Sequence, residues 1–323
     1  MPTSPHICAV IPCYKVKAHI LSVISRIGSE VTGIYVVDDC CPESSSDLVR
    51  ELCTDSRVHV ICNEKNQGVG GAVMAGYRAA IADGAEIIVK IDGDGQMDPK
   101  LLPRFVNPIL QGQADYTKGN RFYDLTNIAR MPAARLFGNA LLSFMTKLST
   151  GYWNIFDPTN GFTAIHARVA SHLPMERISK RYFFETDMLF RLNSIRAVVV
   201  DIPMDSVYGE EQSNLKISGV IPEFLRKHLQ NLLKRIVYNY FLRDMTLASV
   251  ELVVGCGLLL FGVVFGSIQW AQGIRQHTPA PFGTIMLSAL PVLIGLQFVL
   301  AFLGYDISNV PKRPIHDDLP DNR

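Results

Sequence analysis

The stretch VKIDGDGQMDP at residues 89–99 places two carboxylates, Asp92 and Asp94, at the end of an apolar run. The preceding residues 85–91, AEIIVKI, follow an Asp-Gly turn and are rich in β-branched side chains, which predicts a buried strand of a parallel sheet. In open α/β sheets, ligands bind outside the carboxyl ends of the strands, so these carboxylates are placed to hold a ligand. A tight Asp-Gly turn without a ligand is the plainer interpretation.

Strand-like and helix-like segments alternate along the amino-terminal part of the chain. Apolar runs predict strands, and the segments between them predict helices; the strands are 7–12, 34–37, 58–62 and 85–91, and the helices 18–28, 44–54 and 69–82. This βαβ alternation predicts a Rossmann-like, mostly parallel sheet with right-handed crossovers and helices on both faces. Residues 116–208 add short strands and two longer helices.

The chain of 323 residues is long enough for one large domain or two smaller ones, and its formal net charge of +1 gives no reason to expect nucleic acid. Its last quarter is strongly apolar. Residues 245–268 contain one charged residue, Glu251, and residues 282–305 contain none. Each segment has about the 20 residues that a helix needs to cross a bilayer, which predicts a transmembrane hairpin rather than buried core helices.

The charges around these two segments predict an orientation. Basic residues precede the first segment and follow the second, and the connection carries only Arg275; the flanking residues are Arg226, Lys227, Lys234, Arg235, Arg243, Lys312 and Arg313. The positive-inside rule then puts both termini and the amino-terminal domain in the cytoplasm, at the inner or plasma membrane. No secretion-signal pattern precedes residues 6–13, which agrees with that placement.

Residues 221–242 join the α/β domain to the first apolar segment and have the pattern of an amphipathic helix. Apolar residues recur there at spacings of three and four. The pattern predicts a helix on the inner membrane surface or an ordinary helix packed on the domain, and residues 131–148 are similar. The predicted organisation is a cytoplasmic domain, a juxtamembrane helix, a transmembrane hairpin and a cytoplasmic tail, at residues 1–215, 216–243, 244–306 and 307–323.

Acidic residues also follow the second predicted strand, at Asp38 and Asp39. The glycine-rich residues 68–71 do not form a dinucleotide fingerprint, because G-x-G-x-x-G would need glycine at Val73. An acidic crevice accommodates a phosphate-rich nucleotide only with a divalent cation between them. Mg²⁺ or Mn²⁺ takes oxygen ligands from one or two carboxylates and completes its shell with phosphates, which predicts a clamp for a leaving nucleoside diphosphate.

Four motifs in order carry a resemblance to a known family. They are Val10-Ile11-Pro12-Cys13-Tyr14, Val37-Asp38-Asp39, Asn66-Gln67-Gly68 and Asp92-Gly93-Asp94-Gly95-Gln96. The chain resembles family 2 glycosyltransferases of the GT-A fold, and within them the polyprenyl-phosphate glycosyltransferases such as dolichol-phosphate mannose synthase and bacterial GtrB-type enzymes. The resemblance implies transfer of a sugar from a UDP- or GDP-linked donor to undecaprenyl or dolichyl phosphate with inversion. It also suggests a homo-tetramer.

The same resemblance assigns roles to residues on the donor side. It implies that the nucleoside is held by Pro12, Tyr14, Val37 and Asp39, with Asp92 also binding the nucleotide. It further implies that Asp92, Asp94 and Gln96 serve the metal and the diphosphate.

The resemblance assigns four catalytic candidates in all: Asp94 of the Asp-x-Asp turn, and three residues further along the chain, Arg121, Asp157 and Glu185. Arg121 matches the family's Gly-x-Arg segment and implies a phosphate contact, and Asp157 begins an Asp-x-x-x-Gly-Phe element near the acceptor. Glu185 belongs to a Glu-x-Asp helix start that supports the site, although taken alone it could simply stabilise a helix N-terminus. With Asp94, these residues complete the set.

A lipid monophosphate has a second pKa of about 6, so near pH 7 it is already largely dianionic and needs no general base. Its placement calls for cations, and Arg121, Arg135 and Lys147 are the candidates. The chain departs from the family at residues 206–214, which lack the usual Arg and Ser-Lys pair. We therefore add Lys216 as a substitute contact for the lipid phosphate.

Two alternatives remain open from the sequence. A processive polysaccharide synthase would resemble a chain with more spans and a Gln-x-x-Arg-Trp motif, which does not occur here. A non-catalytic membrane scaffold or channel subunit would use Glu251 and Gln297 as polar residues within its spans. Metal-dependent nucleotide binding would distinguish an enzyme from a non-catalytic scaffold or a channel subunit.

Overall fold

The computed structural model describes residues 5–123, 133–205 and 217–320. The chain divides into two compact units, Met1–Leu232 with Pro311–Arg323, and Leu233–Val310. The first unit contains an α/β sheet and the end of the chain, and the second consists mainly of two long apolar helices.

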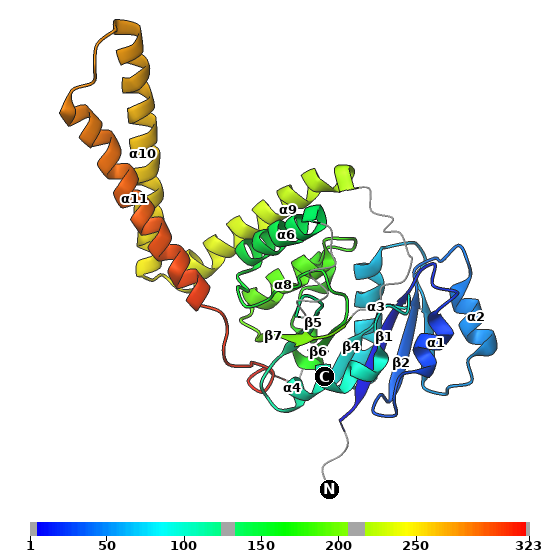
Figure 1. The fold of residues 1–323 in the computed structure, drawn as a ribbon. Helices are drawn as coiled ribbons and strands as arrows, with labels where there is room; N and C mark the ends of the chain where they lie inside the picture. The colour runs from blue at the N-terminus through cyan, green and yellow to red at the C-terminus, as the bar shows by residue number, and fades with distance from the viewer. Residues whose placement is uncertain (1–4, 124–132, 206–216, 321–323) are drawn as a thin grey trace. The chain divides into compact units, whose positions relative to one another are not determined.

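Within the described residues, seven strands of the first unit form one sheet in the order β3-β2-β1-β4-β6-β5-β7 (Figure 1). Only β6 runs antiparallel to its neighbours β4 and β5, whereas the other pairs are parallel. The predicted mostly parallel GT-A-type sheet is confirmed. The strands are β1 Ile7–Cys13, β2 Gly33–Asp38, β3 Val58–Cys62, β4 Ile87–Lys90, β5 Tyr116–Asn120, β6 Thr163–His166 and β7 Val199–Pro203.

Helices cover both faces of the sheet, as the βαβ alternation predicts. The helices of this unit are α1 Ile20–Ser25, α2 Ser45–Leu52, α3 Val69–Ala82, η1 Pro99–Leu101, α4 Leu102–Leu110, α6 Ala133–Thr150, α7 Ala167–Ser171, η2 Met175–Arg177 and α8 Phe184–Ser194. Helix α3 packs closely on β1 and β2, because Gly76 leaves room for Val10 and Val37 of those strands. Helices α1 and α4 contribute to a core on the other face.

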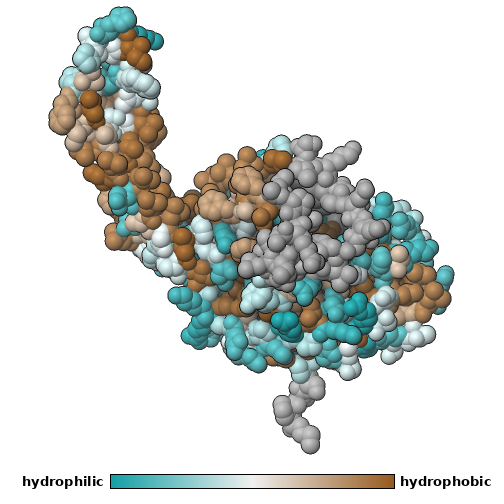
Figure 2. Space-filling view, in the orientation of Figure 1, coloured by the Kyte–Doolittle hydropathy of each residue, from teal (hydrophilic) through white to brown (hydrophobic). Residues whose placement is uncertain are grey.

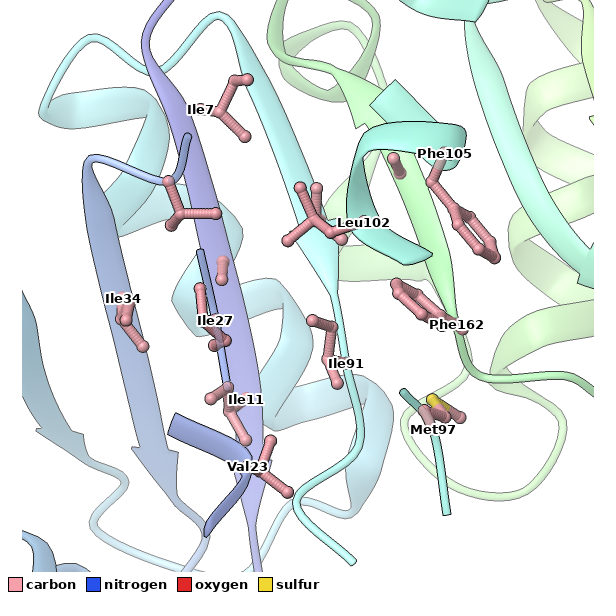
Figure 3. Packing of buried hydrophobic residues seen from close by; sticks show 14 of the residues in the cluster. Ile7, Ile11, Val23, Ile27, Ile34, Ile91, Met97, Leu102, Phe105 and Phe162 are labelled. Carbon is pink, nitrogen blue, oxygen red and sulfur yellow. The ribbon is translucent and has the colours of Figure 1, made fainter. Parts of the chain in front are cut away.

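That core explains why the apolar runs form buried strands. Alternate residues of β1 and β2, such as Ile11 and Ile34, belong to one buried cluster with Val23 of α1 and Leu102 of α4, and Ile11 lies close to Val23 (Figure 3). The ring of Phe105 in α4 stacks on the ring of Phe162, the residue before β6, with the two ring centroids 3.9 Å apart. Burying these side chains is the main favourable contribution to folding of the first unit.

Helix α9, Ile217–Val237, continues into a π-helical turn, η3, Tyr238–Arg243, and then into α10, Leu247–Gln276, and α11, Phe282–Ser308. Helices α10 and α11 are long and apolar enough to cross a membrane, in agreement with the two predicted spans. Apolar side chains cover most of their surface (Figure 2). Gly255 and Gly295 allow close packing, because a Cβ on Gly295 would lie 2.8 Å from the Gly255 carbonyl oxygen.

A buried polar cluster closes the base of this hairpin. The Arg235 guanidinium pairs with the Asp306 carboxylate at 2.5 Å and 3.0 Å, and both side chains are buried. The Tyr240 hydroxyl donates to the same carboxylate at 2.5 Å. Since a buried charge is stable only when paired and hydrogen-bonded, this cluster fixes the end of α11 against the segment that precedes α10.

The chain end returns to the first unit after α11. The buried Asp115 carboxylate, at the start of β5, accepts hydrogen bonds from the backbone N–H groups of Ile315 and His316 and from His316 Nδ1. The His316 ring also stacks on His166 at the end of β6, with centroids 4.5 Å apart. The tail is thereby held at the edge of the sheet where β5 begins.

Candidate active site

The sheet topology brings the predicted motifs to one edge. Strands β1, β2, β4 and β5 run in the same direction, so their carboxyl ends meet there. Strand β6 runs the opposite way and therefore begins at that edge, with Thr163 opposite Lys90 in the β4–β6 register and opposite Lys118 in the β5–β6 register. Residues 157–162, which precede β6, consequently lie beside the Asp-x-Asp turn.

The predicted nucleoside side lies at the ends of β1 and β2. Pro12 and the buried Val37 belong to these strands, and Tyr14 follows β1 with its side chain 44% exposed. Asp39 is nearly buried, and its carboxylate accepts hydrogen bonds from Asn63 Nδ2 and from the backbone N–H groups of residues 67 and 68. Asp39 therefore fixes the loop between β3 and α3 at this end of the sheet.

Asp92 is held by a charge that the sequence analysis did not assign. Its Oδ1 lies 2.9 Å from Nζ of Lys90, the last residue of β4, and Glu185 Oε1 lies 3.5 Å from the same Nζ. Burial lowers the pKa of Lys90, but the carboxylates of Asp92 and Glu185 outweigh that effect and the pKa is raised. Glu185 stands in the first turn of α8, so the pair connects that helix to the Asp-x-Asp turn.

Asp94 and Gln96 continue the turn in partly exposed positions. Asp94 Oδ1 accepts a hydrogen bond from the Gln96 backbone N–H at 3.0 Å. Gly95 between them has a φ of +79°, a conformation that favours glycine and lets the turn fold back on itself. Among the described residues, no three His, Cys, Asp or Glu side chains form a ready metal cage. The available donors are carboxylate oxygens, which suit a hard cation that completes its shell with phosphates.

Arg121 and Asp157 were predicted as separate contacts, and the structure pairs them. Arg121 Nε donates to Asp157 Oδ2 at 2.7 Å, and Arg121 Nη2 donates to Oδ1 at 3.0 Å. Asp157 is fully buried, and Arg121 Nη2 also donates to the Thr159 hydroxyl at 3.1 Å. A two-pronged pair of this kind fixes the guanidinium plane at this edge of the sheet.

The predicted lipid-phosphate contacts are only partly described. Lys147, in α6, places its Nζ 5.5 Å from the centre of the Phe156 ring, beside the Asp157 segment. The side chain of Arg135, the third residue of the same helix, lies outside the described residues, as do Lys216 and the altered loop 206–214. Of these contacts, the structure therefore shows only Lys147, which lies beside the Asp157 segment.

Two further titratable groups near the site were missed. Lys118 is fully buried in β5, which lowers its pKa to about 8, and its Nζ donates to the Asn160 carbonyl oxygen. Asp201 of β7 is also largely buried, which raises its pKa to about 7, and it accepts a hydrogen bond from the Phe156 backbone N–H. A lysine inside an apolar run is a sequence signal of this kind for Lys90 in β4, whereas Lys118 lies in the mostly polar strand YTKGN, where no such signal exists.

The fold and site together define a class of protein: a GT-A-type transferase domain with an Asp-x-Asp turn at the edge of its sheet. Among solved structures, glucosyl-3-phosphoglycerate synthase from Mycobacterium tuberculosis in complex with UDP has a TM-score of 0.52 at 20% identity, over 72% of this chain and 80% of the other. Its complex with Mn²⁺ and UDP-glucose has a TM-score of 0.53 at 19% identity, over 72% and 79%.

The family follows from the sequence. The model described as Glycosyl transferase family 2 matches residues 8–173, just over half of the chain, so this protein belongs to that family and is a glycosyltransferase. A UDP-N-acetylglucosamine-dolichyl-phosphate N-acetylglucosaminyltransferase of Methanococcus voltae is 28% identical over 215 residues, 62% of this chain and 85% of the relative. An undecaprenyl-phosphate mannosyltransferase of Micrococcus luteus is 27% identical over 221 residues, 67% and 90%. The predicted family is confirmed.

Proposed function

We propose that this glycosyltransferase moves a sugar from a UDP- or GDP-linked donor to a membrane polyprenyl phosphate, with inversion at the anomeric carbon. The relatives from Methanococcus voltae and Micrococcus luteus carry names of that reaction class, with a dolichyl and an undecaprenyl phosphate acceptor. A dolichol-phosphate mannosyltransferase of Pyrococcus furiosus, 26% identical over 71% of this chain and 64% of its own, adds a third. All three act on a lipid phosphate.

The main support for an acceptor in the membrane is the amphipathic character of α9, whose apolar side chains are exposed and whose polar side chains are buried. Its outward side chains Ile221, Leu225 and Leu229 are each more than half exposed and recur every four residues. Its buried side is polar. His228 forms a hydrogen bond with Ser149 of α6 at 2.8 Å, and the Asn231 side chain donates a hydrogen bond to the carboxylate of Asp187 in α8. An exposed apolar face is unfavourable in water, and a helix of this kind is stable at a membrane interface.

Helix α6 lies beside α9 and has a similar outer surface (Figure 1). Phe137, Leu141 and Phe144 are each at least half exposed on it. Lys147 follows these side chains near the carboxyl end of the helix and leads to the Asp157 segment. A polyprenyl phosphate whose chain lies in the bilayer would reach the site along this helix, with its phosphate at the polar end.

The donor half of the site fits a divalent cation with a nucleoside diphosphate. Asp94 and Asp92 would hold Mg²⁺ or Mn²⁺ with Gln96 beside them, and phosphate oxygens would complete the shell. Such a cation supplies charge stabilisation for the leaving diphosphate. Arg121, oriented by Asp157, would hold the phosphate groups that meet at the reacting centre.

The arrangement of Asp157 agrees with an acceptor that needs no general base. Both carboxylate oxygens accept hydrogen bonds from Arg121, and Thr159 Oγ1 lies 3.3 Å from Oδ1. A carboxylate engaged in this way is poorly placed to remove a proton from a substrate. A lipid phosphate is already ionised near pH 7, so orientation of the phosphate is enough for a single inverting displacement.

The return of the chain end supports the proposed topology. The backbone of Ile315 and His316 binds Asp115 of the catalytic domain, which is the contact expected if the segments before α10 and after α11 lie on the same side of a membrane. Two crossings satisfy that condition. The distribution of basic residues then favours a cytoplasmic catalytic domain with both termini inside.

A direct assay tests this function. The purified protein is incubated with undecaprenyl phosphate, Mn²⁺ and a panel of UDP- and GDP-sugars, and the released diphosphate and the lipid-linked product are measured. We expect one sugar to be transferred to undecaprenyl phosphate and none to undecaprenol. Transfer to undecaprenol at the same rate, or polymer formation, would refute the proposal. Light scattering on the same preparation tests the predicted homo-tetramer.

A further inference from the structure

The buried ammonium group of Lys90 has no role in the function proposed so far. Its side chain is 1% exposed at the end of β4, yet its Nζ lies 2.9 Å from Asp92 Oδ1, one of the two predicted carboxylate ligands of the metal. A charge in a dry interior is unfavourable unless it is paired. A lysine at this position therefore calls for a physical explanation, since an apolar residue would fill a strand position more simply.

The surrounding backbone encloses the ion pair on one side. A Cβ at Gly161 would collide with Asp92 and would lie only 2.5 Å from Lys90 Nζ, so this segment approaches as closely as a glycine permits. On the other side, Glu185 Oε1 lies 3.5 Å from the same Nζ. The Asp92 side chain keeps 29% of its surface exposed, so a single carboxylate separates the buried ammonium from a ligand that binds at the Asp-x-Asp turn.

We propose that Lys90 is a positioning residue that sets the balance between metal binding and diphosphate binding in the empty site. Its fixed positive charge offsets part of the negative charge of Asp92, Asp94 and Glu185. A divalent cation alone then binds weakly, and a diphosphate alone is repelled less than it would be by the carboxylates. The site thereby favours the two together over a metal that occupies it first.

This inference rests on the proposed function for the identity of the two ligands. It differs in what it predicts, because a residue that only supports the fold would affect both ligands in the same direction. Removal of a positive charge has opposite effects on a cation and an anion. Two separate binding measurements therefore distinguish an electrostatic role from a structural one.

The test compares Lys90→Met with the wild-type protein. Binding of Mn²⁺ without nucleotide is measured from the electron paramagnetic resonance signal of the free ion, and binding of UDP and of GDP in EDTA by calorimetry. For Lys90→Met we expect Mn²⁺ to bind about tenfold more tightly and the nucleotide about tenfold more weakly, since unit charges a few ångströms apart interact strongly at such a site. Lys100→Met removes the same charge from an exposed residue and should change neither constant.

Glu185→Gln covers the case in which Lys90→Met does not fold. It removes a negative charge beside the same ammonium, so Mn²⁺ alone should bind several-fold more weakly and the nucleotide alone more tightly. Unchanged Mn²⁺ affinity in either folded variant, or weakening of both ligands together, would overturn the role of Lys90. If the wild-type protein binds neither nucleotide even with Mn²⁺, the proposed function fails, and the Mn²⁺ measurements still decide the role of Lys90.

Discussion

Arg121 and Asp157 lie 36 residues apart in the chain and form a two-pronged ion pair, with Arg121 Nε 2.7 Å from Asp157 Oδ2 and Arg121 Nη2 3.0 Å from Oδ1. The sheet explains the encounter, because Arg121 follows β5 and Asp157 lies in the segment that leads into the antiparallel β6. A buried carboxylate that orients a guanidinium in this way is consistent with the proposed phosphate contact of Arg121.

We expect Asp157→Asn to lower kcat/KM for the lipid by roughly ten- to a hundredfold, which corresponds to about 1.5–3 kcal/mol for a lost charge-assisted hydrogen bond. The pH profile should keep its shape, since in the proposed mechanism Asp157 orients Arg121 and no residue acts as a base. Thr159→Val, which removes one neutral partner of Arg121, should have a smaller effect. Loss of the acidic limb of the pH profile in Asp157→Asn would instead assign Asp157 as a base.

Asp94→Asn tests the metal clamp. We expect turnover to fall far more than tenfold and Mn²⁺-dependent nucleotide binding to be lost, because one of two carboxylate ligands is gone. The melting temperature should hardly change, since Asp94 is partly exposed. Asp98→Asn is a matched control, because Asp98 pairs with Arg26 outside the crevice and should retain metal-dependent binding. Full activity of the wild-type protein in excess chelator would contradict the clamp.

The contact between His316 and Asp115 predicts a pH-dependent contribution to stability. The hydrogen bond that the His316 ring donates to the Asp115 carboxylate raises the pKa of His316, with Asp317 acting in the same direction and burial and Arg168 opposing it. A raised folded-state pKa means that this stabilisation is fully present below the unfolded pKa of about 6.5 and is lost as the pH rises through the folded value. The charged form of His316 therefore holds the tail most strongly in mildly acidic conditions.

The measurement is thermal unfolding of His316→Gln and of the wild-type protein. Relative to the wild-type protein, the melting temperature of the variant should be lowered more at about pH 6 than at about pH 8.5. His166 acts in the opposite sense, because burial lowers its pKa to about 4 and its neutral form stabilises the fold only until the pH falls toward that value. His59→Gln on the exposed strand β3 is the control. An equal loss at both pH values would exclude protonation of His316 as the cause.

How well the sequence predicted each structural feature depends on how far apart in the chain its interacting residues lie. Strand β4 and the Asp-x-Asp turn were predictable, because both depend on neighbouring residues. The contact between Lys90 and Glu185 joins residues 95 positions apart and depends on where α8 begins, which no local pattern specifies. The same holds for Asp115, whose partners Ile315 and His316 arrive after the apolar hairpin, 200 and 201 positions later.

Helix α9 shows a different limit of sequence patterns. Its spacing predicted an amphipathic helix correctly, but a stripe of apolar residues does not say whether that stripe meets a protein core or a membrane. The structure buries His228 and Asn231 and exposes Leu225 and Leu229, so the apolar stripe does not face the core of the domain, which supports the proposed membrane contact. Arg121 and Asp157 were likewise both expected at the site, but their direct pairing required the antiparallel course of β6.

Cysteine labelling tests the topology. In a Cys256→Ser background, Gln276→Cys places a thiol at the exposed end of α10, and a membrane-impermeant reagent should label it in intact cells. A tag after Arg323 should react only once the membrane is opened, because the tail binds the catalytic domain, which we propose to be cytoplasmic. Labelling of the tag from outside would contradict the two-crossing arrangement.

The ionisation of the acceptor separates phosphate transfer from hydroxyl transfer. If the nucleophile is a lipid phosphate, kcat/KM for the lipid should rise with pH and reach a plateau near about 7, because the second phosphate pKa is about 6. A hydroxyl acceptor would instead depend on the pKa of a protein base. We therefore expect the pH profile to follow the acceptor and to shift when a lipid phosphonate of higher pKa replaces the phosphate.

The cations predicted for this acceptor should affect the lipid and not the nucleotide. Arg135→Ala and Lys147→Ala should each raise KM for undecaprenyl phosphate by roughly tenfold or more, as expected for loss of a charge-assisted contact, and leave nucleotide-sugar affinity nearly unchanged. Lys100→Ala, at an exposed position of η1, controls for a general loss of positive charge. If either variant weakens nucleotide binding while the lipid kinetics stay the same, the acceptor phosphate does not bind at the end of α6, and the cations that hold it must be sought elsewhere at the crevice.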